Sequence, residues 1–207
     1  VTDRSGITGE KMELDGYNWI EGAATAIYNH QGKNALCTIA AFNKPADEKV
    51  AHEIVMQIAA MNPIAIDEDG VSEEIKQKEI QVAIDKTKAE QVQKAVEAAL
   101  KKAGFNLYIA ENEEHLNEGV MKGNITEAQA EEIRQLKAKV AEEKAANLPA
   151  AMIENIAKGR LGKFLKEVCL LKQEDIMDPK KTVADVLKES DPELKVVDFK
   201  RFTLRAE

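Results

Sequence analysis

The stretch that most restricts the possible folds is a long polar segment in the middle of the chain. Ser72, a common N-cap residue, precedes a run that continues to Ala103 and predicts a capped helix of unusual length. Between Glu73 and Gln91 apolar positions are sparse, and Lys, Glu and Gln fill most of the others. A helix without a broad apolar stripe cannot be enclosed in a core. The fold must therefore leave much of this helix in solvent.

A second polar helix follows, and its pattern predicts that the two helices pack against each other. Gly104 ends the first helix, and the second begins at Thr126, where Thr126 and Gln129 have the spacing of a capping box. Narrow seams on two consecutive long helices favour an antiparallel coiled-coil hairpin that projects from the core. We assign residues 81–147 to this insertion. The seam of the second helix consists of Ile133, Leu136 and Val140.

The connection between the two helices is too apolar for a solvated loop. A connection of this length and composition favours a small folded tip with its own apolar cluster. The sequence leaves the role of this tip open. Its large apolar residues are Phe105, Leu107, Tyr108, Ile109, Leu116, Val120 and Met121.

Two apolar segments near the start of the chain predict a β-hairpin. They run from Gly22 to His30 and from Ala35 to Phe42, and Gly32 in the short turn between them can supply a positive φ. The second segment is apolar on both faces, which indicates a central strand covered on both sides. Apolar residues at helical spacing between Ala46 and Met61 then predict a helix with one buried stripe.

The last part of the chain returns to the core. A helix is predicted from Ala150 to Leu171, packed on the sheet, and Thr182 is placed to cap a short helix over Val183–Glu189. A third strand is predicted from Leu194 to Leu204, and its alternation slips around Val196 and Val197, which indicates a bulge or twist. Periodicity assigns these residues to the core: Phe164, Leu170, Leu171, Val183, Leu187, Phe199 and Phe202.

These segments together predict an α+β fold. Its core is a three-stranded antiparallel sheet covered by helices, and an antiparallel coiled-coil hairpin is inserted into it. Residues 1–80 and 148–207 would form the core subdomain, on either side of the insertion at 81–147. A composition with 32% charged and 4% aromatic residues favours a helical majority.

The sequence contains no pattern that points to catalysis or to a bound cofactor. His30, His52 and His115 stand in unrelated segments without the spacing of metal ligands. No glycine-rich phosphate-binding motif occurs, so we expect no cofactor, no metal and no nucleotide bound by this chain. An enzyme would need convergent polar groups in a pocket, and the carboxylate runs instead favour solvated helix faces.

Charge and hydropathy restrict the partners. A net charge of −8 argues against direct nucleic-acid binding, because phosphate neutralisation needs surplus Lys and Arg. Cys37 and Cys169 each lie in an apolar run and are expected to be small buried hydrophobes without a disulfide. No segment approaches the ~20 apolar residues that span a bilayer, so we expect no membrane contact and a cytoplasmic location.

Several motifs in order along the chain resemble the bacterial translation elongation factor Ts family. They are AIYNHQGKNALCTIAAFN, AHEIVMQIAAMNP, GRLGKFLKEVCLL, KQEDIMDPKKTVADVLKES and VVDFKRF. The resemblance covers nearly the whole chain and implies a factor that binds elongation factor Tu and supports GDP/GTP exchange during protein synthesis. It also implies a coiled-coil insertion at the position deduced above, although the insertion is longer here.

What the chain resembles is the C-terminal core or dimerisation half of that family. The family's other half carries a Thr-Asp-Phe-Val motif whose Phe wedges into elongation factor Tu. Here the only Thr-Asp pair is Thr2-Asp3, followed by Arg4. Because the chain opens on Val1 and not on Met, we expect a fragment or a processed product.

The resemblance also selects a candidate binding site at the hairpin tip. On composition alone, residues 28–32 form an ordinary turn with an exposed histidine. In the family the matching Tyr-x-His-x-Gly tip contacts domain 3 of elongation factor Tu, which implies a partner-binding role for Tyr28, His30 and Gly32. The exchange factor would act by binding the nucleotide-free GTPase more tightly than the nucleotide-bound one. The alternative is a homodimerisation module with no exchange activity of its own.

Overall fold

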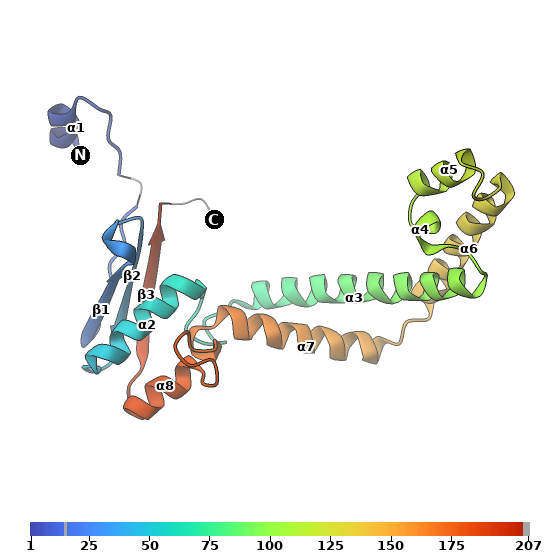
Figure 1. Cartoon of the computed structure of the whole chain (residues 1–207). Coiled ribbons are helices and arrows are strands. Elements are labelled where there is room, and N and C mark those ends of the chain that lie inside the picture. The colour runs from blue at the N-terminus through green and yellow to red at the C-terminus, as the bar shows by residue number, and fades with distance from the viewer. Residues whose placement is uncertain (15, 205–207) are drawn as a thin grey trace. The chain divides into compact units, whose positions relative to one another are not determined.

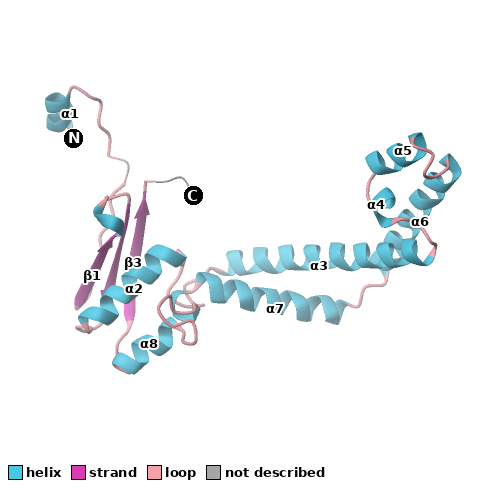
Figure 2. Ribbon diagram, in the orientation of Figure 1, coloured by secondary structure: helices cyan, strands magenta, loops and turns pink. Residues whose placement is uncertain are grey.

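The computed structural model describes residues 1–14 and 16–204, and their contacts divide the chain into two compact units. The first unit joins residues 1–71 to residues from 165 onward, and the second spans residues 72–164. The limits of the insertion at 81–147 stay a prediction. The helices and strands in chain order are α1 (Thr2–Thr8), β1 (Ala24–Asn29), β2 (Leu36–Phe42), α2 (Glu48–Met61), α3 (Glu73–Lys102), α4 (Leu107–Ala110), α5 (Glu113–Met121), α6 (Glu127–Ala146), α7 (Ala150–Val168), α8 (Val183–Ser190) and β3 (Val196–Thr203), as Figures 1 and 2 show.

The first unit is built on the predicted three-stranded antiparallel sheet, and the α+β assignment is confirmed. The strand order is β1-β2-β3, so β2 is central. β1 pairs with β2 in an unbroken register, with Tyr28 opposite Thr38. The pairing of β2 with β3 shifts between Ala41 and Phe42, whose partners are Asp198 and Val196. The predicted irregularity near Val196 is therefore confirmed as a bulge.

Helix α2 covers one face of this sheet, and local signals set both of its ends. The side chain of Asp47 accepts hydrogen bonds from the backbone N–H groups of Lys49 and Val50, at 3.0 and 3.3 Å, which satisfies donors that a helix start leaves free. Asn62 ends the helix in the left-handed region, at φ 45°. The buried stripe of α2 packs on the sheet, together with residues of α8 and of the segments on either side of α8. This core consists of Ala40, Phe42, Ile54, Val55, Ile58, Leu170, Val183, Leu187, Leu194 and Val196.

The opposite face of the sheet is only partly covered by the described residues. Ala41 is fully buried, but Cys37 and Ile39 on β2 are half-buried, and Ile27 opposite Ile39 is 69% exposed. The expectation that β2 is covered on both sides therefore holds only in part: among the described residues, the second face is closed at Ala41 and half open at Cys37 and Ile39. Its apolar residues on both faces reflected a central position in the sheet, whereas helix α2 packs on one face alone.

Part of the predicted core is less buried than periodicity indicated. Leu170, Val183 and Leu187 are fully buried, whereas Phe199 is half-buried at the edge of the core. Phe202 pairs with Cys37 and lies on the opposite face of the sheet. Helix α7, which was predicted to run to Leu171, ends earlier, at Val168. The remaining half-buried members of the predicted set are Phe164 and Leu171.

The early end of α7 has a backbone explanation. Beyond Val168, the N–H groups of Leu170 and Leu171 donate to the carbonyls of Ala65 and Ile66, both at 2.9 Å. Cys169 is extended and forms an isolated parallel bridge with Ala65, so the α-helix cannot continue through it, and Leu170–Lys172 form a short 3₁₀ helix with Leu170 in the core. The helix was predicted too long because this pairing joins segments far apart in the sequence.

The second unit is helical throughout, and its predicted start signals are confirmed. The Ser72 hydroxyl accepts from Ile75 N at 3.3 Å at the start of α3. Thr126 and Gln129 form both bonds of a capping box at the start of α6. α3 and α6 pack against each other. Their apolar cluster, which includes the tip helices, is Val96, Leu100, Ala110, Leu116, Ala130 and Ile133.

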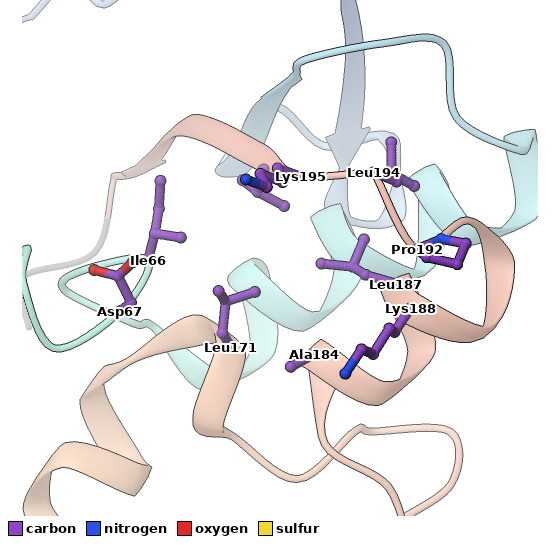
Figure 3. A pocket seen from close by; sticks show the side chains of 10 residues that line it. Ile66, Asp67, Leu171, Ala184, Leu187, Lys188, Pro192, Leu194 and Lys195 are labelled. Atoms are coloured by element: carbon purple, nitrogen blue, oxygen red, sulfur yellow. The ribbon is translucent and has the colours of Figure 1, made fainter.

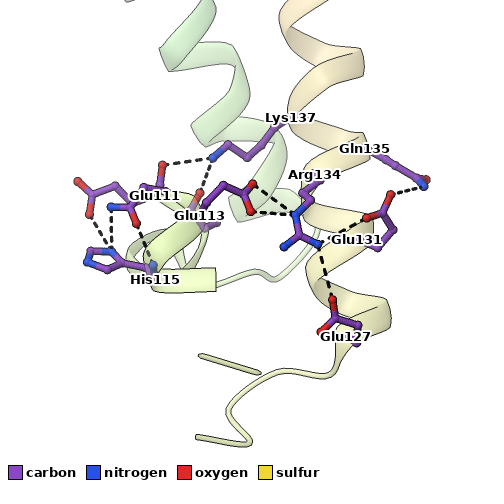
Figure 4. Close-up of polar contacts among 10 residues, drawn as sticks. Glu111, Glu113, His115, Glu127, Glu131, Arg134, Gln135 and Lys137 are labelled. Carbon is purple, nitrogen blue, oxygen red and sulfur yellow. Dashed lines mark hydrogen bonds and ion pairs between the residues drawn. The ribbon is translucent and has the colours of Figure 1, made fainter. Parts of the chain in front are cut away.

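The tip expected between residues 104 and 124 folds into α4 and α5, which polar contacts fix to α6 (Figure 4). The Lys137 ammonium donates to the carbonyl of Ala110 at 2.7 Å and of Glu111 at 3.2 Å, at the end of α4 where helical carbonyls lack partners. Arg134 Nε donates to Glu113 Oε2 at 3.0 Å, at the start of α5. The tip is thus a packed structure and not a solvated loop.

No helix among the described residues combines the length and the hydropathy needed to cross a membrane.

Candidate partner-binding site

The candidate site is the turn between β1 and β2, whose backbone has an unusual shape. Residues His30–Gly32 form a single 3₁₀ turn in which Gln31 has φ 54° and Gly32 φ 65°. Asn34 also has a positive φ, of 55°. Glycine and asparagine tolerate this region, but glutamine adopts it at a steric cost. A Cβ on Gly32 would meet no atom within 4 Å, so Gly32 is needed for its backbone conformation and not for space.

Tyr28 and His30 lie against each other at the tip. The Tyr28 hydroxyl and His30 Nδ1 are 2.9 Å apart, and their rings meet edge to face with centroids 5.8 Å apart. β1 ends at Asn29, so this contact joins a tyrosine near the end of the strand to the first residue of the 3₁₀ turn. Tyr28 is half-buried and His30 is exposed. The hydrogen bond therefore orients an exposed imidazole and leaves its Nε2 for a partner.

Sequence reasoning missed three residues that hold this arrangement. His52 on α2 packs edge-on against the other side of Tyr28, with centroids 5.6 Å apart. Asn29 Oδ1 accepts from the backbone N–H of Asn34 at 3.0 Å, and the two side chains are also hydrogen-bonded to each other, which closes the base of the turn. The asparagines on either side of a tight turn were a usable signal. His52 had none, because its contact depends on how α2 packs.

The site can therefore present a shaped surface but has no catalytic constellation. Tyr28 and His30 come together, whereas Gly32 contributes backbone shape only. Among the described residues, His, Cys, Asp and Glu nowhere gather in threes that could hold a metal ion.

A separate hollow in the first unit is lined mainly by aliphatic side chains (Figure 3). Leu171, Leu187 and Leu194 line it, together with Lys188 and Lys195. It brings no nucleophile and general base together, so the hollow offers no reaction chemistry of its own.

The chain matches the family model described as elongation factor TS over residues 1–206. It belongs to the elongation factor Ts family. The protein named elongation factor Ts from Bacteroides fragilis is 67% identical over all 207 residues, and that from Parabacteroides distasonis is 70% identical over the same length. The elongation factor Ts of Porphyromonas gingivalis is 34% identical over 207 residues.

These relatives are longer than this chain. All of the chain is matched in each, but it spans 63% of the Bacteroides fragilis and Parabacteroides distasonis proteins and 55% of the Porphyromonas gingivalis protein. The family match itself extends over residues 1–206 of this chain. The activity of the longer proteins comes to this chain only as a proposal.

Proposed function

We propose that this chain binds elongation factor Tu and supports GDP/GTP exchange during translation elongation. The observation that carries the proposal is the family match, with 67–70% identity over the full chain to proteins named elongation factor Ts. The exchange requires no covalent chemistry. A factor that binds the nucleotide-free GTPase more tightly than the GDP-bound form lowers GDP affinity by the same factor. The chain acts in the cytoplasm and itself binds no nucleotide, nucleic acid or membrane.

Within this proposal, the hairpin tip is part of the surface that contacts elongation factor Tu. Tyr28 fixes the ring of His30, and Gly32 allows the turn that exposes it. A side chain that is already oriented loses little conformational freedom on binding, so its contacts contribute more of their energy to affinity. The chain corresponds to the C-terminal core half of the family, and this half supplies affinity and orientation.

We expect residues 1–207 to bind elongation factor Tu without full exchange activity. These residues contain no Thr-Asp-Phe-Val sequence, the motif that inserts into the GTPase in the family. Titration against elongation factor Tu should therefore give measurable binding, while release of a fluorescent GDP analogue should accelerate little. Absence of binding would refute the proposed function. Exchange as fast as that produced by a factor containing the motif would refute the division of roles.

His30→Ala should weaken elongation factor Tu binding by about 1 kcal/mol or more, as expected for a contact inside an interface. The thermal transition should hardly move, because exposed substitutions usually change stability by no more than about 0.5 kcal/mol. Calorimetric titration measures the affinity, and melting curves control for folding.

The control for this substitution is His115→Ala, which removes a histidine that stacks on Tyr108 in the other unit. It should leave the affinity unchanged. If both variants bind elongation factor Tu as tightly as the original chain does, the tip is an ordinary turn.

We also propose that α3 and α6 form an antiparallel coiled coil. Support comes from the narrow apolar contact between the two helices, in which Val96 and Leu100 share a cluster with Ala130 and Ile133. The rest of both helices is polar, as the sequence requires of a pair that packs through a single seam.

Homodimerisation is the second candidate function, and the open face of the sheet favours it. Ile27 is 69% exposed there, opposite the half-buried Ile39. A second copy packed on this face would remove Ile27 from water. Light scattering of the isolated chain distinguishes a dimer from a monomer. If a dimer forms by this face, Ile27→Lys should dissociate it.

A further inference from the structure

The segment that follows α7 docks on α2 through buried polar groups. Gln57 Nε2 donates to Gln173 Oε1 and to the carbonyl of Glu174, both at 3.1 Å, and Gln57 Oε1 accepts from Ile176 N at 2.9 Å. Gln57 and Gln173 are almost fully buried. Val183 N donates to the Gln173 carbonyl at 3.0 Å, which closes residues 173–183 into a loop held against α2, hereafter the docked loop.

Asp175 is the charged member of the docked loop and is 1% exposed. Its Oδ2 accepts from the backbone N–H groups of Met177 and Asp178, at 2.9 and 2.8 Å. Its other oxygen, Oδ1, is buried without any hydrogen-bond partner in the described structure. A buried acceptor without a donor carries a desolvation cost, so Oδ1 needs an explanation.

The group that faces Asp175 from α2 is the half-buried carboxyl of Glu53, one helical turn before Gln57. Burial raises the pKa of Glu53, and the neighbouring Asp175 carboxyl raises it further. Lys49 from α2 and Lys181 from the docked loop also face Glu53, and both oppose this rise in pKa. A carboxyl group beside a second carboxyl group keeps its proton to higher pH, because two adjacent negative charges repel each other.

We propose that Glu53 and Asp175 share one proton, with protonated Glu53 donating its O–H to Oδ1 of Asp175. This arrangement supplies the missing donor and leaves a single negative charge on the pair. The attachment of the docked loop to α2 then depends on pH. Loss of the proton places two carboxylates next to each other and weakens this attachment. Aspartate and glutamate can hold such a proton because an O–H···O⁻ bond is among the stronger hydrogen bonds in proteins.

The direction of the pH effect follows from the raised pKa. The folded chain holds the proton more tightly than the unfolded chain does. The contribution of the pair to stability is therefore fully present below the ordinary pKa of Glu, and it is lost as pH rises through the folded pKa. Each unit by which folding raises that pKa changes the unfolding equilibrium constant by about tenfold.

Unfolding of the 207-residue chain in urea between about pH 5 and pH 8 tests this proposal. Glu53→Gln supplies an N–H donor to Oδ1 at every pH, so the unfolding constant of the wild type should increase relative to that of Glu53→Gln as pH rises. Glu48→Gln, an exposed change on the same helix, should follow the wild type. If the ratio of the unfolding constant of the wild type to that of Glu53→Gln stays constant with pH, the proposal is overturned.

A second measurement needs no variant. Carboxyl ¹³C chemical shifts of the wild-type chain report the titration of Glu53 directly, and Glu53 should titrate above its ordinary value of about 4.3. Titration at or below that value would overturn the shared proton even if Glu53→Gln failed to fold.

Discussion

Replacing Phe42 with alanine will lower the free energy of unfolding by about 3–5 kcal/mol, the usual cost of truncating a buried aromatic side chain. Phe42 is 1% exposed and belongs to the core between the sheet and α2. It ends the central strand, where β2 is held by neighbours on both sides. The surroundings therefore have little freedom to collapse into the space left behind. Urea unfolding followed by circular dichroism measures the change.

Phe199→Ala provides the matched control, because it deletes the same atoms from the same sheet. Phe199 lies on β3 opposite Ala40 but is half-buried. Water already reaches part of its ring, so the loss should be clearly smaller than at Phe42. Equal losses at the two positions would mean that burial does not decide the cost here.

Gln57→Ala will lower the free energy of unfolding by about 2–4 kcal/mol, because removing one partner of a buried hydrogen bond leaves the other unsatisfied. The substitution removes the donor to Gln173 and to Glu174, and the acceptor for the N–H of Ile176. Each of these groups belongs to the docked loop. The loop should become less protected against amide exchange than the strands of the sheet.

The same substitution on an exposed helix face separates this effect from helix propensity. Gln81 on α3 is exposed and bonds only to Asp85, one turn away, among the contacts of the described residues. Gln81→Ala should stay within about 0.5 kcal/mol of the original chain. Similar losses at Gln57 and Gln81 would show that the buried network contributes little.

Local signals explain why so much of this fold could be predicted from the sequence. Ser72, Thr126 and Thr182 cap the helices for which they were chosen, since a cap depends on residues only three positions away. The slip of alternation near Val196 likewise marked the bulge. Patterns of this kind are visible without knowledge of the rest of the chain.

The polar network on α2 could not be predicted in this way. Gln57 looks like any polar helix residue, and its partner Gln173 lies on a segment more than a hundred residues later. The candidate site divides along the same line. Tyr28 and His30 belong to one short motif and were expected at one site, whereas the contact of Tyr28 with His52 depends on the packing of α2. Long-range polar pairs have no period and no motif to reveal them.

The pairing of β2 with β3 carries a consequence for the newborn chain on the ribosome. Leu36 pairs with Thr203, so β2 has a bare edge until the ribosome has synthesised the chain past Thr203. At about 5–20 residues per second, that interval lasts on the order of ten seconds or more. The helices between the two strands can form meanwhile from neighbouring residues. Throughout this wait, the backbone edge of β2 is open to wrong pairing and to chaperones.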